Sequence, residues 1–263
     1  MFVVKHITRV GEPMLNHTLD QMAELRLNGM KDAFIEQLEQ PTLFMDMSFE
    51  ERFSFLIDKE VLERKNRRIK YLLLTARLKY RDAYLNDVDY HHSRGFDKKL
   101  IQSLSKNDWL EQFHNLIITG PTGTGKTWFS NALANQAIIS GYSAHYIRIS
   151  TLMAELALKR AEGDYLKWLK RMKSFRLLIL DDLGLMALTT EQTQELLEVI
   201  EARNQNGSII VTSQLPIKEW YSYFKNPTLA DAIMDRLIHN AYKINLQGES
   251  MRKMKNTVTL SDF

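Results

Sequence analysis

Short apolar runs alternate with longer amphipathic stretches through the second half of this chain. The runs lie at residues 116–119, 144–149, 177–180, 208–211 and 242–246. Runs of this length, bounded by polar residues, are typical of buried strands, and the stretches between them have helical periodicity. The alternation predicts an α/β core in which a mostly parallel sheet is covered by helices.

The first third of the chain has helical periodicity instead. Residues 18–40 and 48–85 predict two helices, separated by Pro41 and the stretch 45–48. Ser48 followed by Glu51 predicts a capping box at the start of the second helix. Residues 86–108 are typical of a linker with one short helix near 97–104. We therefore expect a small all-helical domain over residues 1–85, a linker over 86–114 and the α/β domain over 115–263.

A phosphate-binding loop follows the first predicted strand and precedes a helical pattern. It consists of Gly120, Pro121, Thr122, Gly123, Thr124, Gly125, Lys126 and Thr127, and Trp128 continues into the helix. Glycines let the backbone N–H groups point inward around a polyphosphate at the positive end of the helix. Lys126 is expected to neutralise the β and γ phosphates and Thr127 to offer its hydroxyl to Mg²⁺. A simple glycine-rich turn would not require Lys-Thr after the last glycine, so we expect a nucleoside triphosphate ligand.

Two carboxylates, Asp181 and Asp182, end the strand predicted at 177–180. In a P-loop protein the first is expected to hold Mg²⁺ through water and the second to orient and deprotonate the attacking water. Both could instead cap a helix. The loop about fifty residues upstream favours the catalytic interpretation.

Two further candidates are less specific. Ser213, with Gln214 as the alternative, follows the strand at 208–211 and is a candidate to position the lytic water. Serine at a strand end is also common turn chemistry. Arg236 lies near the end of an amphipathic helix, where it is either a solvated cap or a group that reaches the γ-phosphate of a neighbouring subunit.

Charge is unevenly distributed although the net charge is only +3. Residues 12–63 hold four Lys or Arg against twelve Asp or Glu, whereas 64–81 hold eight basic residues and no acidic one. A solvated helix face would explain this run, but its unbroken positive charge favours contact with a phosphate backbone. The DNA-binding candidates on this helix are Arg64, Lys65, Arg67 and Arg68.

Composition excludes several classes of protein. With 44% hydrophobic and 25% charged residues, the chain is typical of globular proteins rather than disordered ones. No apolar run approaches the ~20 residues that a membrane span needs, and the amino terminus lacks a secretory pattern. The chain has no cysteine, which excludes disulfides and thiolate metal sites. We expect a cytoplasmic protein with no membrane partner.

The order of these motifs resembles that of the AAA+ ATPases, and the chain is similar to the clade of the helicase loader DnaC and the transposition ATPase IstB. Three segments resemble IstB-like proteins in particular: 210–216, 226–237 and 248–253. The segment 25–30 and the basic helix extend the likeness over nearly the whole chain. The resemblance implies an AAA+ core that binds ATP between subunits of an oligomer on duplex DNA, with Lys126, Thr127, Asp181, Asp182 and Ser213 on one side and Arg236 supplied from the next subunit.

The resemblance also implies a function in transposition. The protein would bend target duplex DNA without sequence preference and recruit or activate an IstA-like transposase, and ATP hydrolysis would control disassembly. A helix that faces the inner channel in this clade adds the DNA-binding candidates Lys159, Arg160, Lys167, Lys170 and Arg171. The alternative is a DnaC-type loader that acts on single-stranded DNA and a replicative helicase. A metabolic P-loop kinase would need a small-molecule acceptor site that nothing in the sequence suggests.

Two features of the site stay open. Only 27 residues follow Arg236, too few for the full helical lid of many AAA+ proteins, so Arg252 is the available candidate for a second sensor. An aromatic residue before the first strand, Tyr90 or Phe96, is a candidate platform for adenine.

Overall fold

The computed structural model describes residues 11–88 and 95–251, and the chain divides into two compact units, Met1–Lys70 and Tyr71–Phe263. Residues 71–85, which were expected in the helical domain, belong to the larger unit. Each unit has its own packing, and the functional candidates of the α/β core all lie in the larger one.

The smaller unit is helical. It contains α1 (Gly11–Glu24), α2 (Asn28–Glu39), the short 3-10 helix η1 (Pro41–Leu43) and most of α3 (Phe49–Ala76). The helix predicted over 18–40 is interrupted, because Arg26 adopts a left-handed φ of 58° between α1 and α2. Gly29 lets α2 approach α3 closely, since a Cβ there would lie 2.7 Å from the Lys59 carbonyl oxygen.

Helix α3 begins as predicted and ends earlier than predicted. The Ser48 N–H donates to Glu51 Oε2 (2.7 Å) and the Glu51 N–H donates to Ser48 Oγ (3.2 Å), which confirms the capping box. The helix ends at Ala76 rather than at residue 85, because Arg77 takes a left-handed φ of 54°. The chain then continues as an irregular segment of the larger unit.

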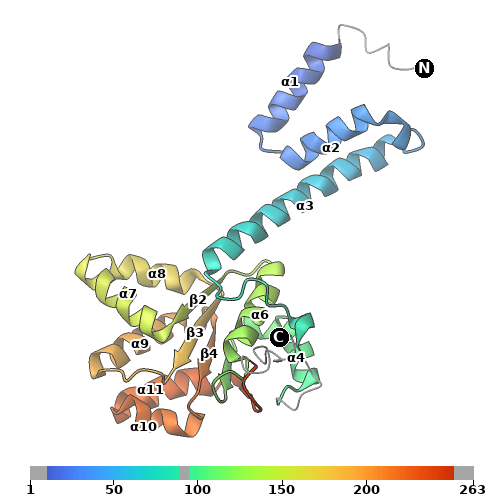
Figure 1. Cartoon of the computed structure of the whole chain (residues 1–263). Helices are drawn as coiled ribbons and strands as arrows, with labels where there is room; N and C mark the ends of the chain where they lie inside the picture. The colour runs from blue at the N-terminus through green and yellow to red at the C-terminus, as the bar shows by residue number, and fades with distance from the viewer. Residues whose placement is uncertain (1–10, 89–94, 252–263) are drawn as a thin grey trace, which may run out of the picture. The chain divides into compact units, whose positions relative to one another are not determined.

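The larger unit is built on five parallel strands in the order β2-β3-β4-β1-β5, as Figure 1 shows in part. The strands are β1 (Asn115–Thr119), β2 (Ala144–Arg148), β3 (Leu177–Leu183), β4 (Ser208–Ser213) and β5 (Ala241–Asn245). The strand runs predicted from the apolar pattern are confirmed. Because the strands are parallel, their carboxyl ends lie at one edge of the sheet, where the chain places its polar residues.

Helices cover both faces of this sheet. They are α4 (Lys98–Ser105), α5 (Asp108–Glu111), α6 (Lys126–Ile139), α7 (Ile149–Ala161), α8 (Tyr165–Ser174), α9 (Thr190–Arg203), α10 (Trp220–Phe224) and α11 (Pro227–Ile238), with short 3-10 helices η2 (Leu85–Asp87) and η3 (Ile217–Glu219). Figure 1 shows α7, α8 and α9 on one side of the sheet and α6 and α4 on the other. The unit therefore has three layers, and the predicted parallel sheet covered by helices is confirmed.

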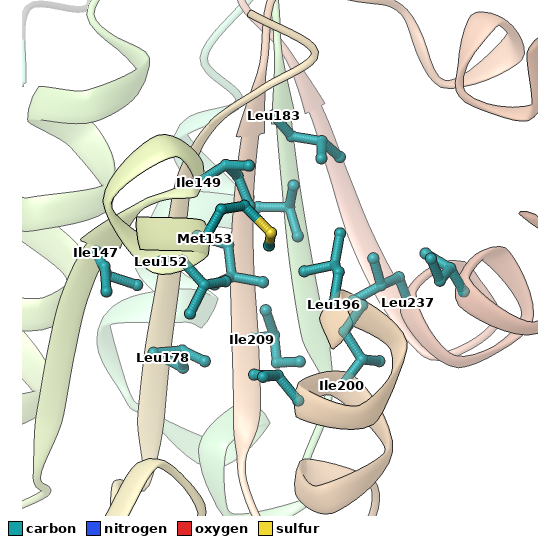
Figure 2. Close-up of a cluster of buried hydrophobic side chains, with 14 of the residues drawn as sticks. Ile147, Ile149, Leu152, Met153, Leu178, Leu183, Leu196, Ile200, Ile209 and Leu237 are labelled. Carbon is teal, nitrogen blue, oxygen red and sulfur yellow. The ribbon is translucent and has the colours of Figure 1, made fainter. Parts of the chain in front are cut away.

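The core between the sheet and helices α7, α9 and α11 is mostly aliphatic. Figure 2 shows Ile147, Leu178 and Ile209 from the strands facing Leu152 of α7 and Leu196 of α9. These side chains are at most 3% exposed. This rigid layer fixes the strand ends that carry the polar site. Among the described helices, none combines the length and apolarity that a membrane span requires.

Candidate nucleotide-binding site

The phosphate-binding loop connects β1 to α6 in the predicted way. Gly120, Gly123 and Gly125 take φ values of 145°, 84° and 98°, which favour glycine and turn the loop around its own N–H groups. Helix α6 begins at Lys126, so its positive end lies at the loop. The local geometry is that of an anion site able to hold a polyphosphate.

Lys126 is held beside this loop. Its Nζ donates to the carbonyl oxygens of Gly120 (2.7 Å) and Pro121 (2.8 Å), and the residue is 6% exposed. The ammonium therefore lies where the loop amides already favour negative charge. Lysine at this position adds a full positive charge to the partial charges of the helix end.

Asp181 is fully buried and surrounded by hydroxyl groups. Thr127 Oγ1 donates to its Oδ1 (2.9 Å), Thr212 Oγ1 donates to the same oxygen (2.5 Å), and the Tyr146 hydroxyl donates to Oδ2 (2.6 Å). Burial, reinforced by the bond to Asp181, raises the pKa of Tyr146 above its ordinary value, so this hydroxyl remains a donor. These bonds hold the carboxylate of Asp181, on β3, against Thr127 in the first turn of α6.

Thr127 and Asp181 are the predicted Mg²⁺ residues, and the structure brings them into contact. A hydroxyl oxygen and a carboxylate at the mouth of a phosphate loop fit Mg²⁺, which prefers hard oxygen ligands and keeps several waters. The fit supports the predicted metal and does not require any other protein ligand.

Asp182 lies on the same strand but faces the opening of the site. Its φ is 63°, and the register of β3 against β4 shifts between Leu180 and Leu183. The Asp182 N–H donates to Thr212 Oγ1 (3.1 Å), which stabilises this bulged backbone. The two adjacent aspartates thus have different orientations and different environments.

Arg148 is a residue that the sequence analysis did not identify. It ends β2, and its Nη2 and Nε lie 2.6 Å and 3.0 Å from Asp182 Oδ2. The bond to Asp182 raises the pKa of Arg148 above its ordinary value. A basic residue at the end of the strand paired with the Asp181-Asp182 strand was the available signal, since Arg148 pairs in register with Asp181.

The polar residues at the tip of β4 divide their roles. Ser213 is 0% exposed, and its hydroxyl donates to the Leu183 carbonyl oxygen (2.7 Å) and accepts from the Leu215 N–H (3.1 Å). Gln214 lines the cavity next to the loop and accepts from Thr122 Oγ1 (2.8 Å). Gln214, the alternative candidate, therefore lines the cavity, whereas the Ser213 hydroxyl is occupied by two backbone groups.

A cavity of about 890 Å³ opens from the phosphate loop. Its walls include Tyr80 and Val88, which precede β1, and Phe96, whose ring lies 4.9 Å from that of Phe129 on α6. Phe96, one of the two adenine candidates, is thus at the cavity, while Tyr90 lies outside the described residues. A triphosphate at the loop would leave its nucleoside against these walls.

The segment after β5 packs on the phosphate loop. The Leu246 N–H donates to the Thr119 carbonyl oxygen (2.8 Å), and the Met251 N–H donates to the Gly123 carbonyl oxygen (3.0 Å). A Cβ on Gly123 would lie 2.1 Å from Ser250 Oγ, so glycine is required there for close approach as well as for its φ. Arg252, the candidate second sensor, lies outside the described residues.

Arg236 does not line this cavity. It lies on α11, where its Nη2 pairs with Glu201 of α9 (2.7 Å) and its Nη1 donates to the Ala232 carbonyl oxygen (2.8 Å). A second, more open hollow of about 670 Å³ includes Arg236 and the acidic residues Asp231 and Asp235. The arginine therefore does not line the cavity of the phosphate loop and lies beside a separate hollow.

The basic candidates differ in how far they are already engaged. Arg64 pairs with Glu60 (2.6 Å) and Arg67 with Glu63 (3.5 Å), one turn earlier on α3. Arg160 pairs with Glu195 (2.7 Å). The remaining candidates are Lys159, which pairs with Glu162, and the exposed Lys65, Arg68, Lys167, Lys170 and Arg171.

Helix α8 carries the more open basic surface. Trp168 and Met172 on its inner side are 7% and 2% exposed in the core, whereas Lys167, Lys170 and Arg171 on its outer side are exposed. This orientation leaves three cations toward solvent.

The phosphate loop, the two aspartates and the strand order define a P-loop nucleotide-binding protein of the AAA+ class. Within that class, the chain belongs to the family of IstB-like ATP-binding proteins, whose family profile matches residues 20–259. Membership confirms the family resemblance, and it makes ATP the nucleotide of this family.

Two relatives illustrate the family. An insertion-sequence protein named as ATP-binding, y4pL of Sinorhizobium fredii, is 40% identical over 241 residues, which cover 91% of this chain and 98% of the relative. The ATP-binding protein named for insertion sequence IS1162 of Pseudomonas fluorescens is 44% identical over 203 residues, covering 77% and 87%. Both names connect this family with mobile DNA.

Solved structures confirm the fold class. The crystal structure of DnaI has a TM-score of 0.54 and 22% identity, covering 68% of this chain and 94% of DnaI. The crystal structure of the DnaC helicase loader has a TM-score of 0.53 and 19% identity, covering 64% and 98%. At these identities the likeness concerns the AAA+ fold.

Proposed function

We propose that this protein is an ATPase that regulates transposition by assembling on duplex DNA. The observation that carries the proposal is the contact of Thr127 with Asp181 beside the phosphate loop, with Asp182 one residue further at the cavity. Insertion-sequence relatives supply the biological context.

The hydrolytic step follows from the residues around the cavity. Lys126 and the loop amides bind the β and γ phosphates, and Asp182 accepts the proton of the attacking water. Thr127 and Asp181 would hold Mg²⁺, which would supply positive charge to neutralise the phosphates. Gln214 lies at the γ-phosphate end and orients the water. The products are ADP and inorganic phosphate.

The second half of the catalytic site comes from a neighbouring copy. Arg236 lies away from the cavity of its own chain and carries a rigid guanidinium suited to transition-state charge. We infer that one subunit's Arg236 completes the site of the next, so the protein works as an oligomer with ATP between its subunits. Hydrolysis then weakens the interface and controls disassembly.

The DNA contact is assigned first to the outer side of α8. Lys167, Lys170 and Arg171 are exposed together there, and duplex DNA presents a dense row of phosphates. Contacts of this kind position a protein without reading bases. We infer that the assembly holds and bends target DNA and offers it to a transposase partner, with Lys65 and Arg68 of α3 as a secondary contact.

Electron microscopy tests this function directly. The full chain is incubated with a non-hydrolysable ATP analogue and either duplex or single-stranded DNA of equal length, with Lys126→Ala as the control. We expect ordered assemblies on duplex with the wild type and none with the variant. Assembly on single strands alone would favour a helicase loader, and a monomer under every condition would contradict both functions.

A further inference from the structure

Two asparagines of the P-loop helix are fully buried, which is unusual for residues that must satisfy four hydrogen-bonding positions. Asn131 and Asn135 lie one turn apart on α6 and are 0% and 1% exposed. Buried amides cost free energy unless they are paired. Their partners therefore indicate what the two residues are for.

Both asparagines bond to one segment outside their own helix, residues 77–88, which connects α3 to the core. Asn131 Oδ1 accepts from the N–H groups of Lys79 (2.9 Å) and Tyr80 (3.2 Å). Asn135 Nδ2 donates to the carbonyl oxygens of Arg81 (3.2 Å) and Ala83 (2.7 Å). Side chains of α6 thus replace the regular backbone pairing that this irregular segment lacks.

The same helix turn is tied to the phosphate site. Asn131 Nδ2 donates to the Thr127 carbonyl oxygen (2.6 Å), and the Thr127 hydroxyl donates to Asp181. One amide side chain therefore joins the first turn of the P-loop helix to the segment 77–88.

The held segment forms one wall of the nucleotide cavity. Lys79, Tyr80, Asp87 and Val88 line the cavity beyond the phosphate loop. Lys79 Nζ lies 5.4 Å from the centre of the Tyr80 ring. Neither Asn131 nor Asn135 lines the cavity, so each can affect a ligand only through the groups to which it bonds.

We propose that Asn131 and Asn135 are positioning residues for nucleoside recognition. They hold residues 77–88 so that the base and ribose of ATP lie against Tyr80 and Val88, while the loop binds the phosphates. The inference rests on the proposed placement of ATP in this cavity, and it adds that affinity for the nucleoside depends on two amides outside the cavity.

Two ligands distinguish the phosphate loop from the cavity wall. Inorganic tripolyphosphate contacts the loop alone, whereas ATP also contacts the wall formed by residues 77–88. Loss of the wall should therefore lower the affinity for ATP and leave the affinity for tripolyphosphate unchanged. General damage to α6 would weaken both ligands, because both use its amino-terminal end.

The experiment compares three variants of the full chain by calorimetric titration with ATP and with tripolyphosphate. Asn131→Ala removes the amide that holds the backbone of Lys79 and Tyr80. Tyr80→Ala removes part of the cavity wall without changing α6. Gln136→Ala is the matched control. Gln136 also bonds from α6 to a backbone carbonyl, that of Ser105 (3.2 Å), but on a segment that does not line the cavity. We expect Asn131→Ala and Tyr80→Ala to lower the affinity for ATP about tenfold, which corresponds to one well-placed contact. Their affinity for tripolyphosphate, and the affinity of Gln136→Ala for both ligands, should equal that of the wild type.

Hydrogen exchange adds a readout that a ligand titration lacks. The amides of Lys79 and Tyr80 should exchange faster in Asn131→Ala, while those of the α6 interior keep their protection. Equal weakening of both ligands by Asn131→Ala, or unchanged ATP binding by Tyr80→Ala, would overturn the inference. If the wild-type protein binds tripolyphosphate as tightly as ATP, the inference about the wall is overturned, but the loop still binds phosphates as proposed. If the wild-type protein binds neither ligand, the proposed function is overturned as well.

Discussion

Arg148 and Asp182 form an ion pair at the edge of the nucleotide cavity, with both guanidinium contacts made to a single carboxylate oxygen, Asp182 Oδ2 (2.6 and 3.0 Å). Asp182 is the proposed general base. Because this oxygen already accepts two hydrogen bonds from the guanidinium, we expect Arg148 to compete with the attacking water for it and so to restrain hydrolysis. The restraint comes from the end of β2, a strand that carries none of the predicted site residues.

Replacing Arg148 with glutamine should therefore raise basal hydrolysis. We expect the steady-state rate of phosphate release without DNA to rise several-fold, because Asp182 Oδ2 becomes free to accept the proton. The matched control is Arg77→Gln, since Arg77 forms a comparable pair with Glu155 (2.9 Å) away from the cavity. A rate below that of the wild type would instead assign the guanidinium to the substrate.

The fold was predictable because apolar runs and loop chemistry are local signals. The strands and the Lys126-Thr127 loop could be recognised from neighbours in the sequence. The break at Arg26 and the end of α3 at Arg77 could not, because arginine has no intrinsic preference for the left-handed φ that it adopts there. At Arg26 the turn is closed by local backbone bonds, from the Leu27 N–H to the Met22 carbonyl oxygen (2.8 Å) and from the Arg26 N–H to the Ala23 carbonyl oxygen (3.0 Å). Arg77 instead pairs with Glu155 (2.9 Å), a residue far away in the sequence.

The site residues could be predicted only where each belongs to a motif whose presence implies the other residue of the contact. Thr127 and Asp181 belong to motifs that imply each other across the sheet. Arg148, which pairs with Asp182, belongs to no motif. Neither does Asn131, which holds the backbone of residues 79 and 80. The choice between Ser213 and Gln214 likewise depends on the exact direction of a strand end, which alternation alone does not fix.

Gln214 and Ser213 should differ in what their loss affects. Gln214→Ala should lower hydrolysis at least tenfold with ATP binding nearly unchanged, because a transition-state contact is removed from the cavity. Ser213→Ala should instead lower the free energy of unfolding by about 1–2 kcal/mol, since its buried hydroxyl pairs with two backbone groups. Kinetic assays and urea denaturation of both variants provide the measurement. If Ser213→Ala lowers hydrolysis and Gln214→Ala lowers only stability, Ser213 is the residue that positions the lytic water.

Arg236→Ala should bind ATP normally and hydrolyse it slowly. Mixing it with Asp182→Asn, which retains Arg236 but lacks the base, should restore part of the activity, because some interfaces then combine an intact base with an intact arginine. Glu201→Gln is the matched variant on the same surface, since Glu201 holds the arginine within its own subunit. We expect it to keep activity. Absence of rescue in the mixture would contradict a role for Arg236 in the neighbouring site.

The outer side of α8 should carry the salt-dependent part of DNA binding. The combined change of Lys167, Lys170 and Arg171 to alanine should weaken duplex binding and lower the slope of log K against log salt by about 2–3, because each phosphate that the protein neutralises contributes about 0.9 to that slope. Arg160→Ala is the control, because Arg160 already pairs with Glu195. An unchanged slope in the triple variant would move the DNA contact to α3.

His145 should make the larger unit less stable in mild acid. The ring is 1% exposed and stacks on Phe175 with centroids 4.7 Å apart, and its Nδ1 lies 3.3 Å from the Thr75 carbonyl oxygen. Burial, with a smaller contribution from Arg77, lowers the pKa of His145 from about 6.5 to about 4. Between these values the unfolded chain binds a proton that the folded chain does not, so stability is complete above about pH 6.5 and falls as the pH approaches 4.

From pH 7.5 to pH 5.0 this single group should remove about 2 kcal/mol from the free energy of unfolding. His145→Gln retains a donor for the Thr75 carbonyl oxygen but does not titrate. Urea denaturation at the two pH values should therefore give a smaller loss for the variant than for the wild type, even though other groups titrate in both. Equal losses in the two proteins would mean that the buried imidazole takes up its proton without unfolding the strand that carries it.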